Sequence, residues 1–139
     1  MKVCDCMTSR PETASLSDRV SDSFSQMRQK GIRHLPVVDE SGTLVGIISD
    51  RDLLPYISVG AAPRRQNGAS AVRVREIMTR SVEVVGPDDT LRVAVELFLE
   101  HRFGALPVVN ASGRLVGILS LIDVFRAWYE LSGGARRES

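Results

Sequence analysis

The feature that most constrains this chain is an internal repeat. The stretch GTLVGIISDRDLL at residues 42–54 has a counterpart, GRLVGILSLIDVF, at residues 113–125. Shifting the sequence by 71 residues (78 minus 7) aligns Met7 with Met78 and carries the match through both stretches without a gap. Chance does not produce a match of this length, so one structural unit has been duplicated. Two copies are too few for a solenoid, and we expect two similar units that pack as a pair.

The composition indicates a folded chain without a strongly charged partner. The 139 residues are 43% hydrophobic and 25% charged, which suits a chain that buries a real core. The formal net charge of +1 lacks the basic excess typical of nucleic-acid or membrane binding. No apolar run is long enough for a membrane helix, and MKVCDCMTSR lacks the apolar core of a signal peptide. We therefore expect a cytoplasmic protein that binds neither membranes nor nucleic acid.

The two cysteines, Cys4 and Cys6, have no distant cysteine with which to form a disulfide. A zinc site needs four ligands, and the two histidines, His34 and His101, lack metal-ligand spacing to the pair. Cys6 aligns with Ile77, which favours apolar packing. We expect no metal site, and a Cys-x-Cys redox or metal sensor is the less favoured alternative.

Each copy has the pattern of a β-α-β-β-α unit. An extended stretch opens it, RPETA in the first copy and SVEVV in the second, and a helix follows. The apolar residues of these helices recur every three or four positions, at Leu16, Val20, Phe24 and Met27 in the first copy and Pro87, Leu91, Val95 and Phe98 in the second. The first helix is predicted to end at Gly31.

The rest of each copy reads as a hairpin followed by a second helix. Gly42 and Gly113 can take the positive φ of the hairpin turn. Ser49 and Ser120 are predicted to begin the last helix, which Pro55 should shorten or kink in the first copy. The predicted fold class is mixed α/β (α+β). The predicted boundaries are a first domain at 1–58, a linker at 59–72, a second domain at 73–131 and a flexible tail at 132–139.

Two long stretches, IRHLPVVDESGTLVGIISDRDLL and FGALPVVNASGRLVGILSLIDVF, resemble the second halves of cystathionine-β-synthase (CBS) domains. VCDCMT and VREIMT resemble the opening segment of the same family, so the chain is identified as a tandem CBS pair, or Bateman module, from residue 3 to about 129. The resemblance implies two units packed sheet against sheet about a pseudo-twofold axis. It also implies clefts that hold adenosine-containing ligands such as AMP, ADP, ATP or S-adenosylmethionine, no required cofactor, and a homodimer.

The Ser-x-x-Asp motif within each repeat has two interpretations. Ser49 can cap the helix that follows it, whose first-turn N–H groups suit a phosphate, and Asp52 can accept hydrogen bonds from two ribose hydroxyls. The same spacing is a helix capping box that needs no ligand. The motif alone leaves both open, whereas the CBS resemblance implies a ligand role for GIISDRD and GILSLID.

The first copy is favoured as the main site because it has three basic residues, Arg33, His34 and Arg51. The second copy has Gly104, Ala105 and Ile122 at the aligned positions. In the family, one copy supplies the ribose and phosphate contacts of a cleft and the other supplies the base pocket. The main nucleotide site is thus predicted at Ile47, Ser49, Arg51, Asp52, Arg33 and His34, with Thr79, Val84, Phe103 and Gly104 around the base. A second possible nucleotide site is predicted at Ile118, Ser120, Asp123, Thr8, Thr13 and Ile32.

No catalytic motif stands out, since the nucleophile elbow, the phosphate loop and the dinucleotide fingerprint are all absent from the sequence. We expect a stand-alone, non-enzymatic regulator that senses an adenine nucleotide, forms a homodimer and signals to an unknown regulated protein. A ligand-free dimerisation scaffold is the alternative from another class. Trp128 and Tyr129 are predicted to serve core or dimer packing.

Overall fold

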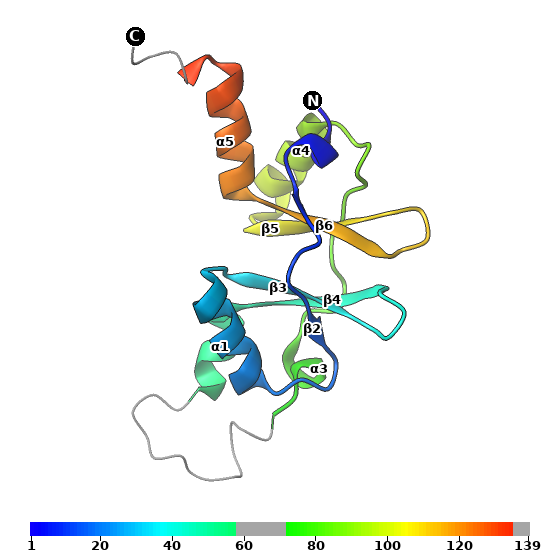
Figure 1. Cartoon of the computed structure of the whole chain (residues 1–139), viewed down its shortest axis with the longest axis vertical. Coiled ribbons are helices and arrows are strands. Elements are labelled where there is room, and N and C mark those ends of the chain that lie inside the picture. The colour runs from blue at the N-terminus through cyan, green and yellow to red at the C-terminus, as the bar shows by residue number, and fades with distance from the viewer. Residues whose placement is uncertain (58–71, 135–139) are drawn as a thin grey trace. The chain divides into compact units, whose positions relative to one another are not determined.

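The computed structural model describes residues 1–57 and 72–134 (Figure 1). Of the predicted linker at 59–72 only Val72 is described, and the last five residues of the predicted tail also lie outside the described ranges. The chain divides into two compact units: unit 1 comprises Met1–Pro11 and Glu83–Ser139, and unit 2 comprises Glu12–Val82. Each unit has one three-stranded sheet with helices, which confirms the mixed α/β class.

Unit 2 is built around the predicted hairpin of the first copy. Its elements are β2 (Ala14–Ser15), α1 (Val20–Lys30), β3 (His34–Val38), β4 (Leu44–Ser49), α2 (Asp50–Leu53), the 3-10 helix η2 (Leu54–Tyr56) and α3 (Val74–Ile77). The strands lie in the order β2-β3-β4, with β2 parallel and β4 antiparallel to β3. Gly42 has φ 86° in the hairpin turn, as predicted.

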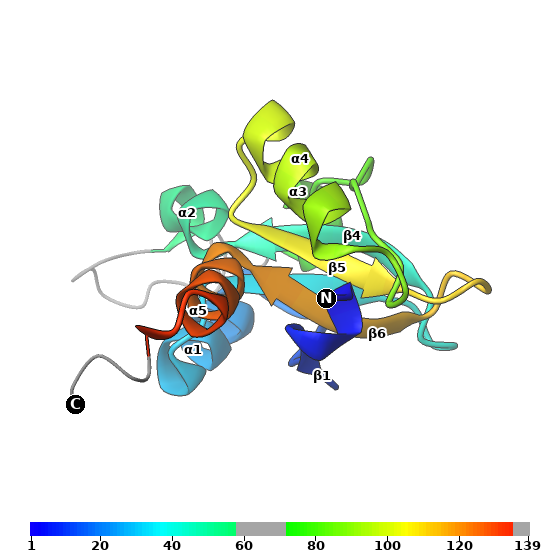
Figure 2. The ribbon, with the colours of Figure 1, turned by 90° about the horizontal axis from the view of Figure 1, so that it is seen from above.

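Unit 1 repeats this plan with the second copy. Its elements are the 3-10 helix η1 (Val3–Asp5), β1 (Thr8–Ser9), α4 (Leu91–His101), β5 (Ala105–Val109), β6 (Leu115–Ser120) and α5 (Leu121–Leu131). Its sheet has the order β1-β6-β5 with both pairs antiparallel. Figure 2 shows β6 continuing directly into α5, as the sequence predicts for Ser120.

Most helix boundaries agree with the sequence, including the starts of α2 and α5, whereas α1 and α4 begin later than predicted. As predicted, Gly31 ends α1 with φ 67°. Also as predicted, the helix before Pro55 is short, since α2 has only four residues. The starts of α1 and α4 differ from the prediction, because Leu16 and Pro87 both precede their helices. In unit 2 the Asp18 carboxylate accepts the Ser15 N–H at 2.9 Å, which closes a turn before α1 begins.

The opening segment of each repeat lies with the hairpin of the other repeat. Thr8 pairs with Ile118 in unit 1, whereas Ile47 and Thr79 exchange two backbone hydrogen bonds of 3.0 Å in unit 2. Val3 is therefore buried in the core of unit 1, among side chains of the second copy. The compact units consequently do not coincide with the repeat boundaries at 1–58 and 73–131.

One buried hydroxyl makes a testable contribution to stability. Ser23 of α1 is 1% exposed, and its Oγ has no hydrogen-bond partner in the described part of the chain. The aligned residue of α4 is Ala94, which is fully buried. Because an unpaired buried hydroxyl costs roughly 1–3 kcal/mol, we expect Ser23→Ala to raise the free energy of unfolding by about 1–2 kcal/mol.

Chemical denaturation measures this change, and the reciprocal substitution Ala94→Ser is the matched control. It places a hydroxyl at the equivalent buried position and should lower the free energy of unfolding by a similar amount. A Ser23→Ala chain that is less stable than the wild type would show that the hydroxyl is paired after all.

Candidate functional site

The Ser-x-x-Asp motif of unit 2 forms the predicted capping box at the start of α2. The Asp52 N–H donates to Ser49 Oγ at 3.1 Å, and the Ser49 N–H donates to Asp52 Oδ2 at 3.0 Å. The side chain of Asp52 is exposed, and its second oxygen, Oδ1, has no hydrogen bond or ion pair within residues 1–57 and 72–134. The cap thus uses one carboxylate oxygen, and among the described residues the other stays without a donor and could accept hydrogen bonds from a ligand.

The predicted cations lie near this box in unit 2. The carbonyl oxygen of Arg33 accepts the Asp50 N–H at 2.9 Å, and His34 lies opposite Ser49 in the β3–β4 pairing. Arg33 and Arg51 are exposed, and neither joins an ion pair with any described residue. Two exposed arginines in the same unit as a carboxylate oxygen that no described residue engages suit a ligand with both hydroxyl and phosphate groups.

His34 differs from the sequence-based expectation in its charge. Its side chain is half-buried, and this burial is the main reason that its pKa lies below the ordinary value of 6.5. Asp50 and Asp52 raise the pKa and Arg33 lowers it, but these effects do not outweigh the burial. His34 is therefore neutral at pH 7, where it can donate or accept a hydrogen bond but does not add positive charge.

The lowered pKa of His34 predicts how stability depends on pH. The unfolded chain, in which the pKa is 6.5, binds a proton more readily than the folded chain, so stability falls as the pH falls through and below 6.5. We expect His34→Gln to reduce this loss, as measured by urea denaturation between about pH 7.5 and about pH 5.5. The control is His101→Gln, since His101 is exposed. Identical pH profiles for wild type and His34→Gln would contradict the interpretation.

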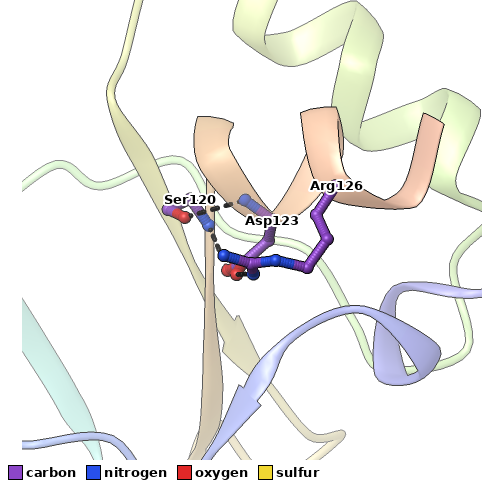
Figure 3. A network of polar contacts seen from close by, with 3 residues as sticks. All are labelled: Ser120, Asp123 and Arg126. Atoms are coloured by element: carbon purple, nitrogen blue, oxygen red, sulfur yellow. Dashed lines mark hydrogen bonds and ion pairs between the residues drawn. The ribbon is translucent and has the colours of Figure 1, made fainter. Parts of the chain in front are cut away.

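The corresponding motif in unit 1 has the same capping box but a different environment. Ser120 Oγ accepts the Asp123 N–H at 3.1 Å, and Asp123 Oδ2 accepts the Ser120 N–H at 2.9 Å. Arg126 lies one helical turn further on, and its Nη1 is 3.4 Å from Asp123 Oδ1 (Figure 3). The Asp123 side chain is only 12% exposed. Both of its oxygens are therefore engaged inside the protein.

The predicted residues fall into both units. Unit 2 holds the predicted residues Thr13, Ile32, Arg33, His34, Ile47, Ser49, Arg51, Asp52 and Thr79. Unit 1 holds Thr8, Val84, Phe103, Gly104, Ile118, Ser120 and Asp123. Ile47 is hydrogen-bonded to Thr79, and Thr8 pairs with Ile118, so the structure brings these predicted residues together.

Three other predicted residues have contacts of their own. Phe103 stacks on His101 with 5.2 Å between ring centroids, and the Gly104 carbonyl accepts the Leu121 N–H at 3.2 Å. Thr13 lines a separate pocket of about 770 Å³ beside Asp39 in unit 2. Ser49 and Asp52 do not line that pocket.

The thiol of Cys6 lies in a partly buried, apolar environment. Burial is the first cause and Asp5 the second of a raised pKa for Cys6, so its thiol stays protonated at neutral pH. Its Sγ lies 3.2 Å from Met1 Sδ, and its side chain packs against the core of unit 1. No cluster of His, Cys, Asp and Glu that could hold a metal ion exists among the described residues. Across the same residues, no helix combines the length and apolar character needed to cross a membrane.

Comparisons with known proteins agree with the duplicated unit. A family model described as the CBS domain matches residues 3–59 and again 74–130. The chain is 34% identical over 150 residues to the chloroplastic CBS domain-containing protein CBSX2 of Arabidopsis thaliana, an alignment that covers 90% of this chain and 62% of that protein. It is 31% identical to the homoserine O-acetyltransferase of Methanococcoides burtonii, covering 89% of this chain but 23% of the enzyme. The chain thus spans only part of these curated relatives.

Solved structures match over nearly the whole chain. The structure of CBSX2 in complex with AMP has a TM-score of 0.81 at 35% identity, covering 94% of this chain and 98% of that one. The CBS domain pair of protein MJ0100, in complex with 5-methylthioadenosine and S-adenosyl-L-methionine, has a TM-score of 0.78 at 27% identity, covering 92% and 99%. Two related pairs of this fold therefore bind adenosine-containing molecules.

Proposed function

The chain belongs to the CBS domain family as a tandem pair, and from this premise we propose that it is a regulatory module that binds an adenosine-containing ligand and signals its presence to a partner protein. The candidate ligands are AMP, ADP, ATP and S-adenosylmethionine. The proposed role is not enzymatic. In the homoserine O-acetyltransferase the chain matches only 23% of the length, so the enzyme's activity is not transferred to this chain.

The observation that carries the proposal is the Asp52 oxygen Oδ1, to which no described residue donates a hydrogen bond. A carboxylate that already caps a helix through Oδ2 is held in place, so Oδ1 is presented in a fixed position. Exposed Arg33 and Arg51 in the same unit can neutralise a phosphate. A ribose phosphate combines the hydroxyl donors and the negative charge that these groups would bind. The AMP-bound and S-adenosylmethionine-bound relatives support this choice of ligand class.

A panel of ligands in a thermal unfolding experiment tests the proposal. AMP, ADP, ATP, S-adenosylmethionine and NAD are each added to the full chain, with uridine monophosphate and inorganic phosphate as controls. A ligand at about 100 times its Kd stabilises the folded chain by about 2.7 kcal/mol, so a bound adenosine compound should raise the melting temperature by several degrees. A panel without any shift would favour the ligand-free scaffold.

We also propose that the chain forms a homodimer, because unit 1 has an exposed apolar surface on α5. The same surface would serve the alternative role as a ligand-free dimerisation scaffold. Ile122, Phe125 and Trp128 of α5 are 59%, 60% and 66% exposed. They help to line an apolar groove of about 910 Å³ that Leu91 and Val95 of α4 complete. Exposed aromatic clusters of this kind commonly mark protein interfaces. Light scattering on the full chain, with and without AMP, measures whether its mass is that of one chain or two.

A further inference from the structure

We infer that Arg126 is a specificity-determining residue that keeps the Asp123 carboxylate from accepting ribose hydroxyls, so that the two copies of the motif differ in what they bind. This inference rests on the proposed function. It concerns unit 1 only, where Arg126, Asp123 and Ser120 form one polar network (Figure 3).

The two capping boxes are nearly identical in their backbone contacts. Each serine hydroxyl accepts the aspartate N–H at 3.1 Å, and each carboxylate accepts the serine N–H at 3.0 Å in unit 2 and 2.9 Å in unit 1. The backbone therefore does not distinguish the two motifs. What differs is the partner of the remaining carboxylate oxygen, Oδ1.

The residue three positions after each aspartate explains this difference. Asp123 is followed by Arg126 on the same face of α5, and an i,i+3 pair of opposite charges is close enough to interact. Asp52 is followed by Pro55, which has no side-chain donor and comes after α2 has ended at Leu53. The first copy therefore cannot form the equivalent ion pair.

Burial strengthens the effect in unit 1. The Asp123 side chain is 12% exposed, whereas Asp52 lies on the surface. An ion pair with a mostly buried member is screened less by water than a fully exposed pair. A ribose that approached Asp123 would have to displace the Arg126 guanidinium, whereas no residue of 1–57 or 72–134 forms an ion pair with Asp52.

The test uses a chain that carries Asp52→Ala, in which binding at the first motif is weakened. Adding Arg126→Gln to this background removes the competing charge and keeps a side chain that suits a helix. We expect AMP, titrated by calorimetry, to bind about 3- to 10-fold more tightly than to Asp52→Ala alone. The matched control is Arg92→Gln, since Arg92 forms a 3.3 Å ion pair with Glu96 on the neighbouring helix α4. The control should leave AMP binding unchanged.

A second ligand shows whether the gain comes from the ribose. The monophosphate of 2′,3′-dideoxyadenosine lacks both hydroxyls and should show no gain when Arg126→Gln is added. Equal gains for both ligands would overturn the inference, because the gain would then not depend on the ribose hydroxyls. Weaker AMP binding after Arg126→Gln would also overturn it and would assign Arg126 to the phosphate. Should the variant fail to fold in a melting experiment, Arg126→Ala takes its place.

The same data separate the inference from the proposed function. If AMP binds the wild type and is weakened by Asp52→Ala, but Arg126→Gln changes nothing, the proposed function stands and the inference fails. If neither AMP nor any other adenosine ligand of the panel binds the wild type, both fail together.

Discussion

Replacing Asp52 with alanine is expected to weaken binding of an adenosine ligand by about 10- to 100-fold. The substitution removes Oδ1, which would form a charge-assisted hydrogen bond worth roughly 1.5–3 kcal/mol. Asp123→Ala should have a smaller effect, because Arg126 already engages that carboxylate at 3.4 Å. Titration calorimetry on both variants measures the difference.

A control separates the ligand contact from the helix cap. Asp52→Ala also removes the acceptor for the Ser49 N–H, so a part of the loss could reflect a weakened start of α2. Ser49→Ala weakens the same cap from the other side and leaves the carboxylate in place. If Ser49→Ala reduces affinity as much as Asp52→Ala does, the motif acts only as a cap, and equal losses for Asp52→Ala and Asp123→Ala would refute the asymmetry.

Replacing Gly46 with alanine is expected to lower the free energy of unfolding by roughly 2–3 kcal/mol, the upper part of the range for overpacked sites. A Cβ at this position would lie 2.6 Å from Met78 Sδ and 2.9 Å from the Thr79 carbonyl oxygen. The sulfur can move, but the carbonyl is held by its 3.0 Å hydrogen bond to the Ile47 N–H. The added methyl group must therefore force β4 and the segment around Thr79 apart.

Chemical denaturation measures this loss, with Gly86→Ala as the matched control. A Cβ at Gly86 meets its nearest atom at 3.7 Å, which is an ordinary van der Waals contact. Gly117→Ala should be destabilising for the same reason as Gly46→Ala, since the side chain of Met7 and the Thr8 carbonyl lie against it. A Gly46→Ala chain as stable as the wild type would mean that the Thr79 segment is loosely held.

The local features of the site could be predicted because they depend on nearby residues. The cap at Ser49 needs only Asp52 three positions later, and the positive φ at Gly31 and Gly42 needs only glycine at the end of a helix or in a tight turn. These predictions were confirmed. The ion pair between Arg126 and Asp123 could also have been predicted, since their i,i+3 spacing is visible in the sequence.

Two other features could not be predicted, because they depend on residues far apart in the chain. Met7 and Met78 are the same residue type in the same repeat position, so the sequence does not say against which hairpin glycine each will pack. The neutral state of His34 depends on burial, which no short motif reports.

The pairing of Thr8 with Ile118 has a consequence for the order in which the chain assembles during synthesis. Unit 2 is continuous from Glu12 to Val82 and can close before the second hairpin has been made. Thr8, by contrast, has no strand partner until Ile118, 110 positions later (118 minus 8), has been added. At about 5–20 residues per second, the first strand of the nascent chain waits roughly 6–22 seconds before its own sheet can form.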